Sequence, residues 1–151
     1  MPETIISDAT CFIILSKIGE LDLLRATYGS VVTTSTVAIE YGDPLPDWVT
    51  VRDPIALSQQ DSIGILGRGE ASAISLALEI AGSVVILDDL QARRIAEKLG
   101  LSVTGTLGVL VRAKLDNVIP SIRPLLAKMR RTNFRLSLKI EAEALKQAGE
   151  L

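Results

Sequence analysis

Short runs of β-branched residues alternate with longer segments of helical periodicity along this chain. The runs "TIIS", "VVT" and "VVIL" have the length and composition of strands, and the segments between them repeat apolar residues every three or four positions. Alternation of this kind predicts βαβ units, in which each helix carries the chain back so that successive strands run parallel. We therefore expect an α/β fold with a mostly parallel sheet.

The same patterns give approximate positions for the elements. Strands are expected at 4–7, 31–33, 48–52, 84–87 and 101–104. Helices are expected at 10–17, 20–28, 35–42, 57–66, 69–81, 89–99, 106–116, 121–132 and 137–148. The last segment is ambiguous, because 134–140 alternates like a strand whereas Leu138, Ala142 and Leu145 follow helical spacing. Since Ser137 offers an N-cap, we interpret this segment as a helix.

Histidine is absent from the sequence, and the single cysteine, Cys11, stands between apolar neighbours. Ser-His-Asp triads, Cys-His pairs and His-ligated zinc sites are therefore excluded. Carboxylates are plentiful, with 18 Asp and Glu residues. Sites made only of oxygen ligands suit hard cations such as Mg²⁺ and Mn²⁺.

Length and hydropathy set further expectations. At 151 residues, 48% of them hydrophobic, the chain is expected to form a single domain over 1–151, with C-terminal helices at about 120–148 packed on it. It has no run of about 18 apolar residues, and "CFIILSKI" lacks the basic leader and cleavage site of a signal peptide. We therefore expect no membrane association and a cytoplasmic location. The single cysteine cannot form an internal disulfide, which agrees with a reducing compartment.

Charge is unevenly distributed along the chain. Residues 112–151 carry nine Lys or Arg against four Asp or Glu, whereas the first 111 residues carry seven basic and 14 acidic residues. An acidic body with a basic tail suits a metal site beside a surface that binds a polyanion. A solvated helical face explains the basic tail equally well.

Two adjacent aspartates, Asp88 and Asp89, follow the run "VVIL". The run "TIIS" likewise ends at Asp8, and "SVT" ends in a Gly-Thr-Leu-Gly turn. Because parallel α/β sheets bind ligands outside the carboxyl ends of their strands, these three ends are expected to deliver polar groups to one rim. Each aspartate has a structural alternative as a helix N-cap. Adjacent residues cannot both be the same N-cap, so one of the pair is left for another role.

Two glutamates on expected helices extend the set of acids. Glu70 shares a helix face with Ala73 and Ile74, so its carboxylate is expected beside small, buried residues, where it needs a cation or hydrogen-bond donors. The alternative is an acid placed in the first turn by the helix dipole. Glu40 lies near the end of the short helix expected for "STVAIEY", and taken alone it fits a solvated position better.

Four segments together resemble the PIN-domain nucleases. They are "IISDATCFI", "TSTVAIEYG", "GRGEASAISLALE" and "VVILDDLQARRIAEKLGLSVTGTLGVLVRAK". Each motif is short, but their order and spacing extend the resemblance over essentially the whole chain. The last two segments are similar to a bacterial and archaeal subgroup that is often found with toxin-antitoxin-like proteins.

The resemblance implies a three-layer α/β/α sandwich with a central, mostly parallel, twisted sheet. It also implies an acidic cluster that binds one or two Mg²⁺ or Mn²⁺ ions and cleaves single-stranded RNA. Carried onto this chain, the catalytic acids are Asp8, Glu40, Glu70 and Asp88. Asp8, Glu70 and Asp88 are the implied metal ligands, while Asp89 is a cap or second ligand and Glu40 a ligand or water positioner. The toxin members commonly have Asp at the third position, so Glu70 departs from them.

Hydroxyls and arginines complete the expected site. Thr104 and Thr106 in "TGTLG" are candidates to bond an acid or a phosphate oxygen, and Thr10 is a similar neighbour of the first acid. Hydroxyl caps in a Gly-rich turn are the alternative. Phosphates would be neutralised by Arg93, Arg94, Arg112, Arg130 and Arg131. With aromatic residues at only 3%, platforms for base stacking are scarce.

Two other functions compete with the metal-dependent ribonuclease. One is a PIN-like module that binds nucleic acid or a partner protein without cutting it. The other is a phosphotransfer receiver, which would need a second acidic cluster and a lysine that "ISDAT" and "VTGTL" do not supply. An antitoxin partner is implied by the resemblance, as is a homodimer formed through apolar helix faces such as "ELDLLRATYG".

Overall fold

The central element of the fold is a sheet of five strands, each parallel to its neighbours, in a computed structural model that describes residues 3–56 and 61–151. The strand order is β3-β2-β1-β4-β5. The strands are β1 (Thr4–Ser7), β2 (Val31–Thr33), β3 (Val49–Val51), β4 (Ser83–Ile86) and β5 (Ser102–Thr104). Each lies within the expected range or one residue from it, so the alternation of β-branched runs predicted the sheet correctly.

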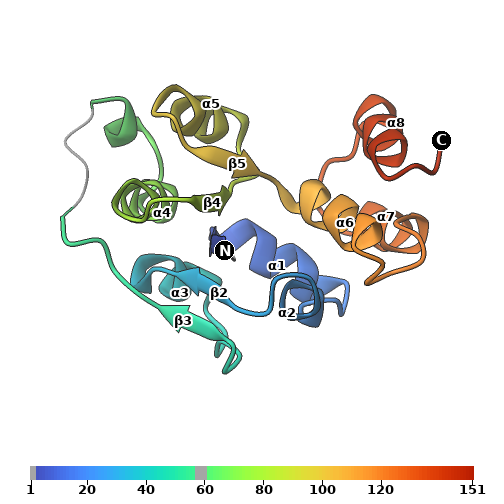
Figure 1. Cartoon of the computed structure of the whole chain (residues 1–151), viewed down its shortest axis with the longest axis horizontal. Coiled ribbons are helices and arrows are strands. Elements are labelled where there is room, and N and C mark those ends of the chain that lie inside the picture. The colour runs from blue at the N-terminus through green and yellow to red at the C-terminus, as the bar shows by residue number, and fades with distance from the viewer. Residues whose placement is uncertain (1–2, 57–60) are drawn as a thin grey trace.

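In the described part of the chain, eight α-helices connect and cover the strands, as can be followed in Figure 1. They are α1 (Ala9–Lys17), α2 (Asp22–Tyr28), α3 (Ser35–Tyr41), α4 (Arg68–Glu79), α5 (Leu90–Lys98), α6 (Thr106–Leu115), α7 (Arg123–Arg130) and α8 (Leu138–Gln147). All correspond to expected helices. The prediction of an α-helix over 57–66 was wrong in type: the described part is a 3₁₀ helix, η1 (Asp61–Ile65), and 57–60 lie outside the described residues. Gly64 and Gly67 lower the helix propensity of this stretch.

Successive residues of the central strands point into two different cores. Along β1, Ile5 packs into a cluster with α1, α2, α6 and α7, whereas Ile6 packs into a second cluster with α4 and α5. β4 repeats the pattern, since Ile86 joins the first cluster and Val85 the second. Strands that are buried on both faces read as continuous apolar runs, which is why "TIIS" and "VVIL" show no polar alternation. The sheet therefore forms the middle of three layers.

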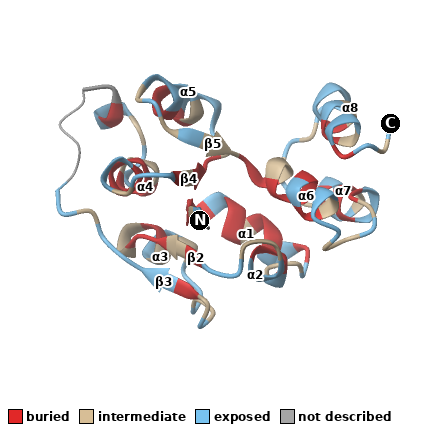
Figure 2. Ribbon diagram, viewed as in Figure 1, coloured by how far each residue is buried: buried red, intermediate tan, exposed pale blue. Residues whose placement is uncertain are grey.

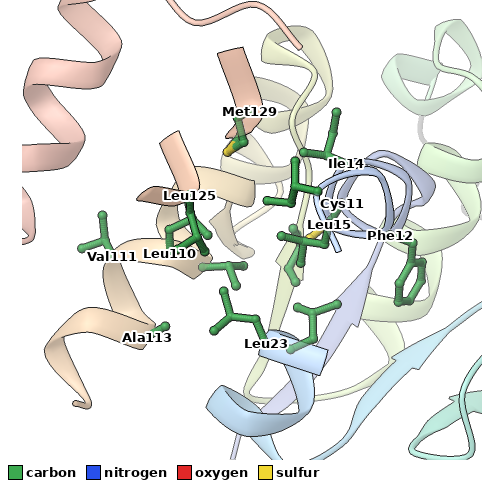
Figure 3. Packing of buried hydrophobic residues seen from close by; sticks show 14 of the residues in the cluster. Cys11, Phe12, Ile14, Leu15, Leu23, Leu110, Val111, Ala113, Leu125 and Met129 are labelled. Carbon is green, nitrogen blue, oxygen red and sulfur yellow. The ribbon is translucent and has the colours of Figure 1, made fainter. Parts of the chain in front are cut away.

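The first core also includes residues of the three helices after β5. Leu125 and Met129 of α7 pack with residues of α1 and α6 in one cluster, shown in Figure 3. Leu23 and Leu24 of α2 are buried in the same core. The apolar face of "ELDLLRATYG", which we expected at a homodimer interface, is thus occupied within the chain.

The ambiguous segment near the C-terminus is a helix. The hydroxyl of Ser137 accepts a hydrogen bond from the Ile140 N–H at 3.1 Å, which is the expected N-cap of α8. Ala144 and Ala148 are buried against the first core, while most of α8 remains exposed (Figure 2). α8 is thus a helix attached along one narrow apolar stripe. Among the residues that the structure describes, no helix is both long and apolar enough to cross a membrane.

We expect Leu126→Ala to lower the free energy of unfolding by about 2–5 kcal/mol, because this α7 side chain is 0% exposed within the first core. Leu138→Ala is the matched control, since Leu138 is 86% exposed and its truncation should change stability by less than about 0.5 kcal/mol. Urea unfolding followed by circular dichroism measures both. Equal effects of the two substitutions would contradict the placement of α7 in the core.

Candidate active site

The carboxyl ends of β1 and β4 bring two aspartates to the same rim of the sheet. Asp8 follows β1 directly, and Asp88 lies two residues beyond the end of β4. The strands pair in register Ser7 with Ile86, and the Asp8 N–H extends the ladder by donating to the Ile86 carbonyl at 3.2 Å. As a result the charge of Asp88 acts directly on the carboxyl of Asp8.

Asp8 is a buried carboxyl, with only 2% of the residue exposed. It caps α1 by accepting a hydrogen bond from the Cys11 N–H at 3.2 Å. Burial, and then the charge of Asp88, raise its pKa to about 8, although the N–H groups of Cys11 and Asp88 favour the charged form. Within the described ranges no basic side chain forms an ion pair with it.

Asp88 is held by a residue at the start of α6. Its two carboxylate oxygens accept hydrogen bonds from the Thr106 N–H at 2.8 Å and the Thr106 hydroxyl at 2.6 Å. Burial raises the pKa of Asp88, and these two bonds and the charge of Arg93 oppose the shift. Thr106, which the sequence suggested as a partner for an acid or a phosphate, is therefore a fully buried support for Asp88.

The adjacent aspartates have separate roles, as their spacing requires. Asp89 caps α5 by accepting a hydrogen bond from the Ala92 N–H at 2.9 Å. Its exposed carboxylate also lies near Glu70 in the first turn of α4. Burial is the main cause that raises the pKa of Glu70, and the charges of Asp89 and Glu40 raise it further. The charge of Glu70 also acts on Asp8, so acids from separate elements lie close enough at this rim to interact.

Glu40 makes a contact that sequence reasoning did not anticipate. Its carboxylate accepts a hydrogen bond from the Gly69 N–H at 2.8 Å, which satisfies an unpaired donor in the first turn of α4. A Cβ added at Gly69 would lie 2.4 Å from a carboxylate oxygen of Glu40. Glycine at this position is therefore what allows the α3 carboxylate to reach α4. We find Glu40 exposed, as expected, but bonded across elements.

A buried hydroxyl pair was also missed. The Thr34 hydroxyl, at the end of β2, lies 2.7 Å from the hydroxyl of Ser72 on α4. Both residues are buried at the rim where β1 and β4 end. The rule that singled out Asp8, a polar residue directly after a short strand, would also have found Thr34 in "VVTT".

The remaining expected residues are dispersed. Thr10 is exposed on α1, and the Thr104 hydroxyl packs against Gly108, where a Cβ would be 2.0 Å away. Arg93 lies near the acids, because its charge opposes the rise in the pKa of Asp88. Arg112 and Arg130 are engaged in ion pairs with Asp116 and Glu141. Arg94 and Arg131 are exposed on α5 and after α7.

The donor chemistry of this rim fits a hard divalent cation. Its potential ligands are all carboxylate or hydroxyl oxygens, and Asp8 is a buried carboxyl whose charged form has backbone donors but no cationic partner in the described chain. Across residues 3–56 and 61–151 no three His, Cys, Asp or Glu side chains are gathered into a ready-made metal-binding group. Asp8 and Asp88 are therefore the candidate centre of the site, with Glu70 and Asp89 as candidates at its margin.

The family model DUF3368, described as a PIN domain, matches residues 4–150. No curated protein matches the chain. The match includes all five strands and the acids described above.

We expect Asp8→Asn to stabilise the metal-free protein, because asparagine keeps the α1 cap and removes a buried charge that Asp88 repels. The folded-state pKa of Asp8 lies above its ordinary 3.8, so the carboxyl favours folding below about pH 4 and loses that contribution as the pH rises through about 8. The gain over wild type should therefore grow from pH 5 to pH 8.5, to on the order of 1 kcal/mol or more. Thermal and urea unfolding in EDTA measure it.

Asp47→Asn, at an exposed loop position, is the control for this comparison and should leave stability and its pH dependence unchanged. An Asp8→Asn protein that is less stable than wild type at pH 8.5 would contradict the electrostatic description of the rim.

We expect Gly69→Ala to displace the Glu40 carboxylate and to cost about 1 kcal/mol of unfolding free energy, the usual value of a lost helix cap. Glu40→Ala should cost a similar amount, and the double variant little more than either, because both remove the same bond. A double-mutant cycle by urea unfolding tests this. Additive losses would show that Gly69 is required for a reason other than Glu40.

Proposed function

The chain belongs to the PIN-domain family, and from this premise we propose that it is a metal-dependent endoribonuclease that cleaves single-stranded RNA. PIN domains are generally nucleases and typically use divalent metals. The observation that carries the proposal is the pair of Asp8 and Asp88, two carboxyls on adjacent strand ends, where burial and then the charge of Asp88 raise the pKa of Asp8. Such a pair is costly to ionise without a cation beside it.

In this proposal Asp8 and Asp88 hold Mg²⁺ or Mn²⁺, and Glu70 completes the ligand set. A bound divalent ion offsets the carboxylate charges, activates water and stabilises charge on a phosphodiester. Thr106 fixes both oxygens of Asp88, and the Cys11 N–H fixes one oxygen of Asp8, so the two central ligands are oriented before a cation binds. Because no three acids are gathered in the described residues, Glu70 must change its side-chain conformation on binding.

The other acids support these ligands. Asp89 starts α5, the helix that carries Arg93 toward Asp88. Glu40 bonds to Gly69 and so holds the first turn of α4, on which Glu70 lies. We therefore propose that Asp89 positions α5 and Glu40 positions α4, and that Asp8, Asp88 and Glu70 bind the metal ahead of either.

A PIN scaffold that binds nucleic acid without cutting it is the second candidate. Two observations favour it. No three acids are gathered among the described side chains. The third acid is Glu70, whose side chain is longer than the Asp that is common at this position in the toxin members. Association with an antitoxin protein and a toxin role remain part of the proposal that follows from the family resemblance alone.

We expect cleavage of a fluorescent single-stranded RNA in Mn²⁺ or Mg²⁺, its loss in EDTA, and a fall of at least about 100-fold in Asp8→Asn and Asp88→Asn. Asp47→Asn should cleave at the wild-type rate. Calorimetric titration with Mn²⁺ separates the two candidates, because a nuclease site binds the ion and loses affinity in Glu70→Ala, whereas a scaffold does not. Full cleavage in EDTA, or by purified Asp8→Asn, would refute the proposal.

A further inference from the structure

A cleft of about 470 Å³ begins at Asp88 and Arg93 and extends between α6 and α8. Its volume lies within the range of about 300–1,000 Å³ that is usual for small-molecule sites. A second hollow of about 310 Å³ continues it along α6, since both are lined by Thr104, Gly108 and Gln147. The acidic rim thus opens into a groove rather than onto a flat surface.

Two glycines line this cleft at the start of α6. A Cβ at Gly105 would lie 2.9 Å from an Asp88 oxygen and 3.3 Å from an Arg93 nitrogen, so glycine is what lets both groups lie close against the backbone. Gly108, three residues further on, contacts Thr104 in the same way. Asp88 and Arg93 therefore reach the cleft across bare backbone.

The opposite wall carries an aromatic ring and a cation. Phe134 and Arg135 lie in the loop between α7 and α8, and both line the cleft. Phe134 is half-buried and packs against the first core, whereas Arg135 is exposed. Neither Arg93 nor Arg135 forms an ion pair within the described chain. The one carboxylate on this wall, Glu143, accepts a hydrogen bond from Gln147 at 3.1 Å.

We propose that this cleft seats the nucleotide that adjoins the scissile phosphate, with its base stacked on Phe134 and its phosphates neutralised by Arg93 and Arg135. The assignment rests on the proposed function, because Asp88 at the mouth of the cleft sets the position of the scissile bond. A half-buried aromatic ring beside two unpaired arginines is the combination that binds single strands irrespective of sequence. Although only 3% of the residues are aromatic, Phe134 lies in the cleft where a base would stack.

Binding of a 5′-fluorescein single-stranded RNA by the full chain tests the cleft, measured by fluorescence anisotropy in an Asp8→Asn background that does not cut the probe. Phe134→Ala is expected to raise Kd by roughly 5- to 150-fold, the usual effect of removing one stacking platform. Phe134→Leu keeps the apolar packing and should bind as poorly, whereas Phe134→Tyr should bind like the parent.

Arg135→Ala should flatten the slope of log Kd against log salt by about 0.7. Leu138→Ala, an exposed apolar residue nearby, is the control.

The failure of this assignment is distinguishable from failure of the proposed function. If the wild-type chain cuts RNA and Phe134→Leu binds the probe as tightly as its parent, the cleft assignment is wrong and the nuclease stands. If neither cutting nor binding of RNA is measurable in the wild type, both are overturned. Circular dichroism melting of each Phe134 variant shows whether a weaker binder is still folded, and a folded Phe134→Leu with normal affinity is decisive against the assignment.

Discussion

The pairing of β1 with β4 is the interaction on which the rest of the structure depends. β1 is the middle strand of the sheet, and four residue pairs fix its register against β4, from Thr4 with Ser83 to Ser7 with Ile86. This register places the carboxyl ends of both strands at the same rim and so brings Asp8, directly after β1, to Asp88, two residues after β4. A slip of one residue would exchange the two cores, because Ile5 and Ile6 pack on opposite faces. Hydrophobic burial on both faces therefore determines where the carboxylates meet.

That arrangement opposes stability at one point of the rim. Asp8 is buried next to another acid, and the groups that favour its charge are backbone N–H donors of Cys11 and Asp88. Asp88 has Thr106 in the same role. Donors of this kind orient a carboxylate without neutralising it, which leaves both carboxylates available to the divalent ion of the proposed function. Functional sites commonly contain groups that are locally destabilising and are held in place by the rest of the fold.

The parts of this site that follow local rules could be predicted from the sequence, and the parts that depend on tertiary contacts could not. Short apolar runs that end in aspartate located Asp8 and Asp88, and N-cap preference explained Asp89. The bond from Glu40 to Gly69 joins residues 29 positions apart, and its only trace in the sequence is a glycine in a helix start. Phe134 was equally hidden, because its segment alternates like a strand and its place on the cleft wall depends on how α8 packs on α6. The 3₁₀ helix η1 departs from the prediction because Gly64 and Gly67 weaken the α-helix that the apolar spacing of this stretch favours.

If acids from separate strands together bind a divalent ion at the rim of the sheet, anomalous diffraction at the manganese edge from a crystal soaked in Mn²⁺ will locate it. We expect an anomalous peak bound by carboxylate oxygens of Asp8 and Asp88, with the Glu70 side chain turned toward it and Asp89 still capping α5. Manganese bound elsewhere, or a rim that stays free of it at saturating concentration while Asp8 and Asp88 keep their present contacts, would show that these acids do not form a metal site.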